Sequence, residues 1–380
     1  MLEQSEAVSG KTANWRFPAE WEAQASVLLA WPHADTDWAP WLKEVEQSYV
    51  ELARAILARA GLLLLVKNKA LEARALRLID RDEARASGKL RTTRYDYDDT
   101  WLRDTGPLTL RKDALRKDAS NTDALNTDAS KKVAADASAT FRWLDFSFTG
   151  WGGKYGASKD DKIIQHLAGL PEFSAIEHVP ISFALEGGAV ESDGAGTLLT
   201  TWNCLSKRHP DKSRAQIEKI LRQNLSVHRV LWLEHGELAG DDTDAHIDTL
   251  ARFAGTDCIV YQSCDDIHDP HYAPLGAMAA EIAQLKQADG NFYRSIALPW
   301  APTLTASDGR RLAASYANYL VLNGAILMPG YGVESDIAAS MQLSLAFPQH
   351  EIVVVPARSL IEQNGSLHCV TMQLPEGTLT

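Results

Sequence analysis

The stretch SVLLAWPHADTDWAPWLKEVEQSYVELARAILARAGLLLLVK, residues 26–67, indicates the fold class. It begins with the apolar run SVLLAW (26–31) and ends with GLLLLVK (61–67), and both runs have the length of a strand. Between them, residues 41–60 carry apolar side chains at steps of three and four, the spacing of an amphipathic helix. A strand, a helix and a second strand in succession are typical of an α/β protein.

The same alternation continues along the rest of the chain. Further apolar runs of strand length are TLLTTW (197–202), HRVLWL (228–233), DCIVYQ (257–262), YLVLNGAILM (319–328) and EIVVVP (351–356). The segment IAASMQLSLAF (337–347) again has helical spacing. Because no Pro/Gly/Ser-rich linker divides the pattern, we predict one α/β domain over residues 1–380, with a flexible N-terminus at 1–15.

One segment departs from this pattern. Residues 111–138, RKDALRKDASNTDALNTDASKKVAADAS, repeat a five-residue unit centred on Asp-Ala and contain no aromatic residue. Such a composition buries too little apolar surface to offset the entropy of ordering the chain. We therefore predict a low-complexity surface insertion between two strands, which is a commoner role for such a segment than an interaction tail.

Composition narrows the functional classes. The 380 residues carry a formal net charge of −12, which disfavours nucleic acid and anionic membranes as partners and is compatible with a cationic ligand. The N-terminus lacks the basic and apolar regions of a signal peptide, and no apolar run is long enough to cross a bilayer. Four cysteines without C-x-x-C spacing indicate neither a disulfide framework nor a cysteine zinc site, so we expect a reducing, cytoplasmic compartment.

Two residues could carry nucleophilic and acid/base chemistry. Cys369 follows the turn-forming Asn364-Gly365-Ser366 and precedes an alternating strand-like segment, a position at which a thiol can be presented to a cleft. Its local sequence by itself favours the commoner interpretation, a small buried hydrophobe. His246 lies in DTDAHID (242–248), and if this segment is extended, two aspartates share its face and favour the imidazolium form.

Three other polar clusters lie beside glycine or proline. Asp104 lies in RDTGP (103–107) and Glu186 precedes a double glycine, although either carboxylate could serve only a turn. The segment DDIHDPH (265–271) contains ligand-like histidines, but their spacing matches no zinc-binding helix pattern. A zinc amidohydrolase built on this segment is therefore the alternative from another mechanistic class.

In this order, the clusters resemble the agmatine deiminase and bacterial-type peptidylarginine deiminase family of the guanidino-group-modifying superfamily. The motifs that carry the resemblance are FPAEWEAQASVLLAWPH (17–33), DDTWLRDTGP (98–107), WGGKY (151–155), LEGGAVESDGAGTLLTTWNCL (185–205), DTDAHID (242–248), SYANYLVLNGAILMPGYG (315–332) and SLHCVTMQLP (366–375). No single motif is decisive, but seven in sequence order are very specific.

The resemblance implies a single-domain, five-fold pseudo-symmetric α/β propeller with a central active site. It assigns the nucleophile to Cys369, the acid/base to His246 and the residue that orients this histidine to Glu186. It implies that Asp104 and Asp248 bind the guanidinium and that Trp101 contacts the substrate. No metal and no organic cofactor are implied, because the substrate supplies its own electrophilic carbon. Relatives of this kind are often homo-oligomers.

The implied reaction is the hydrolysis of agmatine to N-carbamoylputrescine and ammonia through a covalent thiouronium on the cysteine, a step of putrescine biosynthesis. A deiminase of peptidyl or free arginine is the nearest alternative, and a guanidine-binding homologue without activity is another. The sequence departs from the usual agmatine deiminase pattern at two places. Ala245 stands where a glycine is usual before the histidine, and Gln363-Asn364-Gly365 replaces a run of glycines.

Overall fold

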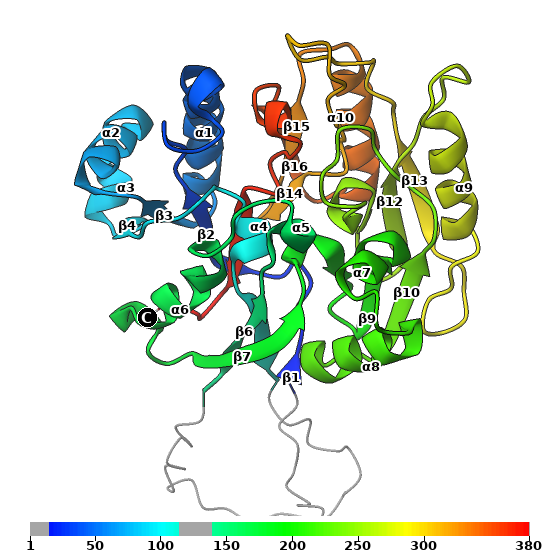
Figure 1. The fold of residues 1–380 in the computed structure, drawn as a ribbon, viewed down its shortest axis with the longest axis horizontal. Helices are drawn as coiled ribbons and strands as arrows, with labels where there is room; N and C mark the ends of the chain where they lie inside the picture. The colour runs from blue at the N-terminus through cyan, green and yellow to red at the C-terminus, as the bar shows by residue number, and fades with distance from the viewer. Residues whose placement is uncertain (1–14, 114–138, 380) are drawn as a thin grey trace, which may run out of the picture.

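The computed structural model describes residues 15–113 and 139–379, which form a mixed α/β single-domain fold with five separate sheets (Figure 1). The first sheet has the order β17-β2-β3-β4, so the last strand of the chain lies beside β2. Its elements in chain order are β2 (Gln24–Ala30), η1 (Ala39–Trp41), α1 (Leu42–Leu57), β3 (Gly61–Val66), α2 (Lys69–Ile79), α3 (Asp82–Ala86), β4 (Leu90–Arg94) and β17 (Thr371–Pro375).

The second sheet has the order β1-β5-β6-β7. Its elements, with the short helix α4 that precedes β5, are β1 (Trp15–Arg16), α4 (Leu102–Thr105), β5 (Leu108–Lys112), β6 (Phe141–Ser147), α5 (Gly150–Gly153), η2 (Asp160–Lys162), α6 (Ile163–Ala168), η3 (Pro171–Phe173) and β7 (Glu177–Ala184). The predicted insertion follows β5 in the sequence, and its first two residues, Arg111 and Lys112, belong to that strand. Its remainder from 114 to 138, like the N-terminal residues 1–14, lies outside the described residues.

The other three sheets have three strands each, in the orders β10-β9-β8, β11-β12-β13 and β14-β15-β16. The elements of the third sheet are η4 (Gly187–Ala189), β8 (Val190–Ser192), β9 (Thr197–Thr201), α7 (Trp202–Arg208), α8 (Arg214–Leu225) and β10 (Arg229–Leu233). Those of the fourth and fifth are η5 (Ile247–Thr249), β11 (Ala251–Phe253), β12 (Cys258–Gln262), α9 (Tyr272–Ile282), β13 (Arg294–Leu298), β14 (Leu320–Leu322), β15 (Ala325–Gly330), α10 (Ser335–Ala346), β16 (Glu351–Pro356) and η6 (Leu360–Gln363).

One arrangement of strands recurs in all five sheets. A short antiparallel pair is followed, through helical segments, by a strand that runs parallel to the second member of the pair. In the first sheet the antiparallel partner is β17, which comes from the other end of the chain and pairs with β2. The sheets lie around α4, which Figure 1 shows near the middle of the molecule.

The apolar runs form strands because both of their faces are covered. In β3, Leu62 and Leu64 pack into one hydrophobic cluster, whereas Leu63 and Leu65 pack into another. A strand buried on both faces has a continuous apolar sequence rather than an alternating one. The strand and helix predictions of the sequence analysis are confirmed at nearly every run, with shifts of one to three residues at the ends.

The run 319–328 is an exception, because it forms two strands instead of one. β14 and β15 pair antiparallel, with Leu322 opposite Ala325, so Asn323 and Gly324 form a two-residue hairpin loop. Asn-Gly is a strong sequence signal for such a loop, and Gly324 has a positive φ of 70°. In the described residues, no helix is long and apolar enough to cross a membrane.

Candidate active site

The predicted site residues lie on equivalent segments of the five sheets, just before the first strand of each antiparallel pair. These segments carry Asp104 before β5, Glu186 before β8, His246 and Asp248 before β11, Asn318 before β14, and Cys369 before β17. The structure thus brings together residues that are up to 265 positions apart. Of these six residues, only Asn318 was not predicted from the sequence.

The thiol of Cys369 lies among polar groups at a buried position. Asn318 donates a hydrogen bond from Nδ2 to the sulfur at 3.1 Å, and the thiol lies 3.5 Å from Asp248 Oδ2. Asn318 Oδ1 also accepts from the backbone N–H of Cys369 at 3.3 Å. Burial raises the pKa of Cys369 well above the usual thiol range, and the nearby charges of Asp248 and Asp104 raise it further. The resting residue is therefore a neutral thiol at neutral pH.

The two aspartates predicted to bind the guanidinium are both buried and differ in their hydrogen bonds. Asp104 accepts from the backbone N–H of Gly188 and from the indole of Trp151, each at 2.9 Å. Asp248 Oδ2 lies 2.8 Å from Nδ1 of His368, and its Oδ1 is buried without a hydrogen-bond partner within the described residues. That oxygen is free to accept from an N–H group of a ligand.

The pKa values of these aspartates shift in opposite directions. Burial raises the pKa of Asp104, and the charge of Asp248 adds to this effect, although His246 opposes it. Burial would also raise the pKa of Asp248, but its hydrogen bond with His368 and the charge of that histidine lower it. Asp248 therefore keeps its negative charge to a lower pH than Asp104 does.

His246 lies between two carboxylates, as a general acid/base would. Its Nδ1 is 3.6 Å from Asp104 Oδ1, and its Nε2 is 3.7 Å from Glu186 Oε2. Burial by itself would lower the pKa of His246, but the charge of Asp104 and the neighbouring Cys204 and Glu186 raise it well above its usual value. The ring is thus an imidazolium in the resting protein, with one nitrogen directed to Asp104 and the other to Glu186.

Glu186 is held in place by Arg208, which the sequence analysis did not select. Arg208 Nε donates to Glu186 Oε1 at 2.7 Å, and its other nitrogens reach Asp244 Oδ2 at 2.7 Å and the carbonyl of Thr243 at 3.0 Å. The guanidinium of this arginine therefore connects the carboxylate of Glu186 with the loop that presents His246.

The second glycine of the Glu186-Gly187-Gly188 motif allows the side chains of the site to meet. A Cβ at Gly188 would lie 2.7 Å from His246 Nδ1 and 2.8 Å from Asp104 Oδ1. Such distances are too short for any side chain, so this position requires glycine. The absence of a side chain at Gly188 thus leaves room for His246 and Asp104 to approach its backbone.

The segment 244–248 is not extended, so the shared face considered in the sequence analysis does not form. Asp244 and Ala245 have positive φ values of 66° and 72°, and Ile247–Thr249 form the 3-10 helix η5. Asp244 therefore does not share a face with His246. Its carboxylate instead pairs with Arg208 at 2.7 Å and Lys154 at 2.8 Å. The carboxylates around the imidazole come from other sheets, a pairing that no local pattern could indicate.

A cavity of about 620 Å³ leads to the thiol and is lined by Cys369, Asp104, Trp101 and Trp151. Trp101, predicted to contact substrate, also packs against Trp38 with ring centroids 5.4 Å apart. The backbone of Gly365 lies against the same indole, because a Cβ at Gly365 would come within 2.1 Å of a ring atom. Trp151, from the WGGKY motif, joins the cavity wall to Asp104 through its indole hydrogen bond.

Gln363 and Asn364, which stand where relatives usually have glycines, lie at the wall of this cavity. Asn364 takes a positive φ of 71°, which asparagine tolerates better than most residues. Its side chain donates to Asp242 Oδ2 at 2.6 Å and accepts from Arg310 at 3.2 Å. Tyr155 donates to the same Asp242 oxygen at 2.6 Å. A polar cluster thus replaces the bare glycine backbone of the usual pattern.

Of the two histidines in 265–271, His271 is buried and has structural partners in this fold, whereas His268 is exposed. His271 Nδ1 lies 2.6 Å from Asp269 Oδ1, and its Nε2 accepts from the backbone N–H of Ala239 at 2.8 Å. Asp269 also pairs with Arg311 at 2.7 Å and accepts from the indole of Trp300 at 3.1 Å. Both ring nitrogens of His271 are occupied, so this histidine has no free nitrogen for a zinc ion.

The Porphyromonas-type peptidyl-arginine deiminase family matches residues 16–375, and the chain belongs to that family. The agmatine deiminase of Stutzerimonas stutzeri (strain A1501) is 30% identical over 94% of this chain and 95% of its own length. The agmatine deiminase of Pseudomonas aeruginosa (strain LESB58) is 29% identical over 95% of each chain.

Solved structures give the same result. A structure described as a candidate arginine deiminase from Porphyromonas gingivalis superposes with a TM-score of 0.84 at 39% identity, covering 96% of this chain and all of its own. A cysteine-to-serine variant of the C. jejuni agmatine deiminase, with substrate bound, superposes with a TM-score of 0.81 at 30% identity. That alignment covers 98% of this chain and 99% of the C. jejuni chain.

Proposed function

We propose that this protein is an agmatine deiminase, which hydrolyses the guanidinium of agmatine to N-carbamoylputrescine and ammonia. The observation that carries the proposal is the arrangement at the end of the cavity. Asp248 lies 3.5 Å from the sulfur of Cys369 through Oδ2, its Oδ1 has no hydrogen-bond partner within the described residues, and Asp104 lines the same cavity as Cys369. A guanidinium is planar and cationic and presents paired N–H donors, so two carboxylates can hold it with its carbon facing a nucleophile.

The reaction then follows from the protonation states of the free protein. The positive charge of the bound guanidinium favours loss of the Cys369 proton to solvent, because His246 is already protonated, and the thiolate attacks the central carbon. His246 protonates the leaving nitrogen, ammonia departs, and a thiouronium remains on the sulfur. The now neutral imidazole takes a proton from water, the hydroxide adds to the same carbon, and the C–S bond breaks to release the ureido product. Glu186 holds and charges His246 throughout.

The cavity wall favours the ammonium of agmatine over the carboxylate of arginine. One guanidinium, that of Arg310, faces eight carboxyl groups along the cavity, those of Asp35, Asp37, Asp98, Asp99, Asp104, Asp160, Asp242 and Glu362. Burial raises the pKa of Asp99 to about 7 and that of Asp160 to about 8, so at neutral pH Asp99 carries about half a negative charge and Asp160 is mostly neutral. The remaining groups still give a negative potential that attracts a dication.

A deiminase of free or peptidyl arginine is the second candidate, and Arg310 is the observation that favours it. This guanidinium could meet a substrate carboxylate or carbonyl at the cavity wall. Its nitrogens already donate to the side chain of Asn364 and, at 2.8 Å, to the backbone carbonyl of Glu362. Arginine would therefore have to compete with existing partners, whereas the ammonium of agmatine would not.

The deciding experiment measures ureido product from the purified full chain with agmatine, free arginine or an arginine-containing peptide, with chelator present. We expect kcat/KM for agmatine to exceed that for arginine by at least about a hundredfold, because the arginine carboxylate would face an acidic wall. Cys369→Ala should lose roughly four orders of magnitude in kcat, and the matched control Cys258→Ala should keep its activity.

Each other outcome has a definite meaning. Turnover of arginine or peptide alone would transfer the protein to the second candidate function. Product from none of the three would contradict the assignment as a deiminase of these substrates. Activity of Cys369→Ala within about tenfold of the parent would remove Cys369 as the nucleophile.

We propose that the five sheets are related by five-fold pseudo-symmetry around the site. The recurrence of an antiparallel pair and a parallel strand in each sheet supports this, as does the position of one site segment before each pair. Superposition of the five units on one another would contradict the proposal if their strands failed to align.

The compartment we propose is the cytoplasm, supported by four free cysteines, and cell fractionation would test it.

We also propose that the protein is a homo-oligomer. On α10, Ile337, Met341 and Leu345 follow one another at four-residue steps and are 69%, 63% and 63% exposed. A helix with an exposed apolar stripe of this kind is typical of an interface. Light scattering should give a mass of at least two chains and a single-chain mass for Met341→Asp. A single-chain mass for the parent protein would contradict the proposal.

A further inference from the structure

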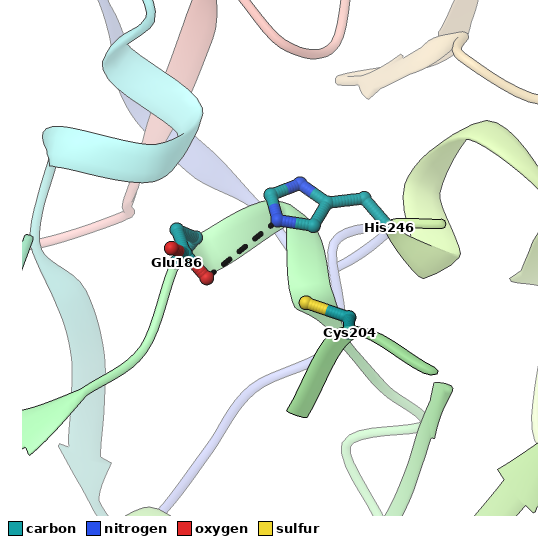
Figure 2. Close-up of side chains that lie close together, drawn as sticks. All are labelled: Glu186, Cys204 and His246. Atoms are coloured by element: carbon teal, nitrogen blue, oxygen red, sulfur yellow. Dashed lines mark ion pairs between the residues drawn. The ribbon is translucent and has the colours of Figure 1, made fainter. Parts of the chain in front are cut away.

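A second thiol, that of Cys204, lies beside the imidazole of His246. The Sγ of Cys204, a ring nitrogen of His246 and a carboxylate oxygen of Glu186 all lie within 4.8 Å of one another, and all three residues are buried. Figure 2 shows the thiol below the imidazole and the carboxylate facing the ring from one side. Cys204 comes from α7, whereas the other two residues come from the loops before β8 and β11.

The carboxylate of Glu186 and the imidazole of His246 each have a polar atom without a hydrogen-bond partner within the described residues, and these two atoms face each other. Glu186 Oε2 and His246 Nε2 are 3.7 Å apart, too far for a hydrogen bond, and both are buried without a hydrogen-bond partner within the described residues. Unpartnered buried polar atoms are costly, so a native structure that keeps them calls for a physical reason. A small cation between the two atoms would satisfy both.

The donor set fits zinc. Thiolate, imidazole and carboxylate are the groups that bind Zn²⁺ in proteins, at bond lengths of about 2.0–2.3 Å. In a tetrahedral site, such bonds place neighbouring ligand atoms about 3.5 Å apart. The present separation of 3.7 Å between Nε2 and Oε2 is close to that value. Three protein ligands would leave a fourth position for water.

We propose that Glu186, Cys204 and His246 form an inhibitory Zn²⁺ site. On binding, the Cys204 thiol and the His246 imidazolium each release one proton, and zinc bonds form to Sγ, Nε2 and one carboxylate oxygen of Glu186. The ring then keeps a single proton on Nδ1, facing Asp104, and can no longer accept a second one. The proposal that the site binds a metal depends only on this geometry. The proposal that the metal inhibits the enzyme depends also on the acid/base role proposed for His246.

The charged side chains around the three proposed ligands have opposite effects on the binding of a cation. Arg208 Nε lies 2.7 Å from the other oxygen of Glu186 and disfavours a nearby dication. The carboxylates of Asp244, which pairs with Arg208 at 2.7 Å, and of Asp104, which lies 3.6 Å from His246 Nδ1, offset that charge. Asp104 also lines the cavity, so a single side chain connects the cavity wall with the imidazole.

Cobalt titration of the full-length protein tests the site, because Co²⁺ bound to a thiolate gives a charge-transfer absorption that zinc abolishes on displacement. We expect Cys369→Ala to bind one Co²⁺ per chain and show this band. Cys204→Ala should lose the band and bind Zn²⁺ at least about a hundredfold more weakly. The matched control Cys258→Ala should behave like the parent protein.

The activity measurement is the second part of the test. Zn²⁺ should inhibit agmatine turnover, a chelator should restore it, and inhibition should weaken in Cys204→Ala by the same factor as binding. A band that persists in Cys204→Ala and vanishes in Cys369→Ala would place the metal at the nucleophile and overturn the proposal. Absence of a thiolate band in Cys369→Ala would also overturn the proposed zinc site. This result does not depend on whether Cys204→Ala folds or on whether the protein turns over any guanidine.

Discussion

At the scale of single residues, the chemistry depends on protonation states that burial imposes. The thiol of Cys369 is surrounded by Asn318 and Asp248 and is buried. Because the pKa of Cys369 is raised, this residue is a neutral thiol in the free protein, and because the pKa of His246 is raised, that residue is an imidazolium. A cationic substrate reverses this preference at the sulfur, because its charge stabilises the thiolate next to it. Nucleophilicity is thereby restricted to the substrate complex.

This protonation state predicts the pH dependence of thiol alkylation in the free protein. Because the pKa of Cys369 lies well above the usual thiol range, the thiolate fraction should rise about tenfold for each pH unit between 7 and 9. The rate of iodoacetamide modification at Cys369, followed by mass spectrometry, should rise in proportion and show no plateau. A plateau below pH 8 would mean that the resting residue is already a thiolate.

At the scale of elements, the loop before η5 presents His246 through an unusual backbone. Asp241 accepts hydrogen bonds from the backbone N–H groups of Thr243 at 2.9 Å and Ala245 at 2.7 Å. The hydroxyl of Thr201 donates to the carbonyl of Ala245 at 2.7 Å. These bonds hold two consecutive residues at positive φ, which costs an alanine about 1–2 kcal/mol. The glycine usual at this position in relatives would avoid that cost.

Replacement of Ala245 by glycine should therefore change the free energy of unfolding by less than about 0.5 kcal/mol. Relief of the positive φ offsets the lost methyl burial and the greater freedom of glycine in the unfolded chain. The matched control Ala339→Gly, at a buried position of α10, should lose roughly 1–2 kcal/mol because no such relief occurs there. Urea denaturation measures both changes, and an equal loss in the two variants would contradict the strain argument.

At the scale of the whole molecule, a buried ionic network connects the sheets next to the site. Arg252 on β11 pairs with Glu20 at 2.6 Å and with Glu191 on β8 at 2.8 Å, and it donates to the carbonyl of Tyr319 at 2.8 Å. Glu20 also lies 2.8 Å from Nε2 of His368, the neighbour of the nucleophile. The position of Cys369 thus depends on contacts between segments more than 300 residues apart.

Removal of the central charge should be costly. Arg252→Met should lower the free energy of unfolding by about 3–5 kcal/mol, because the buried carboxylates of Glu20 and Glu191 would lose the guanidinium that pairs with both. The control Arg222→Met removes an exposed pair with Glu218 at 3.8 Å on α8 and should cost less than about 0.5 kcal/mol. Equal effects of the two substitutions in denaturant titration would show that the network contributes no more than a surface pair.

The same network predicts loss of stability in acid. Burial would raise the pKa of Glu20, but the charges of Arg252 and His368 lower it well below the usual glutamate range. A group with a lowered folded pKa contributes stability that is complete above the unfolded pKa near 4.5 and is lost as pH falls through the folded value. In Arg252→Met this contribution of Glu20 should diminish, so the parent and the variant should differ less in stability at pH 3 than at pH 7.

Local patterns in the sequence determined the elements of this protein. The apolar runs at 26–31 and 61–67 and the helical spacing at 41–60 required no distant contact to be recognised, because strand and helix periodicity are properties of neighbouring residues. The hairpin at Asn323-Gly324 was also present as a local signal. The ordered set of motifs indicated Cys369, His246 and the carboxylates as the reacting groups.

Only the tertiary structure decided which groups face one another. Asp104 and Glu186, and not the adjacent Asp244, flank His246, because strands distant in sequence bring three loops to one point. Asn318 carried no signal beyond its motif, since an asparagine before a strand is ordinary until its amide is found against the thiol. Cys204 resembled a core cysteine for the same reason. Distances between residues far apart in sequence, and the burial that shifts their pKa values, exist only once the chain has folded.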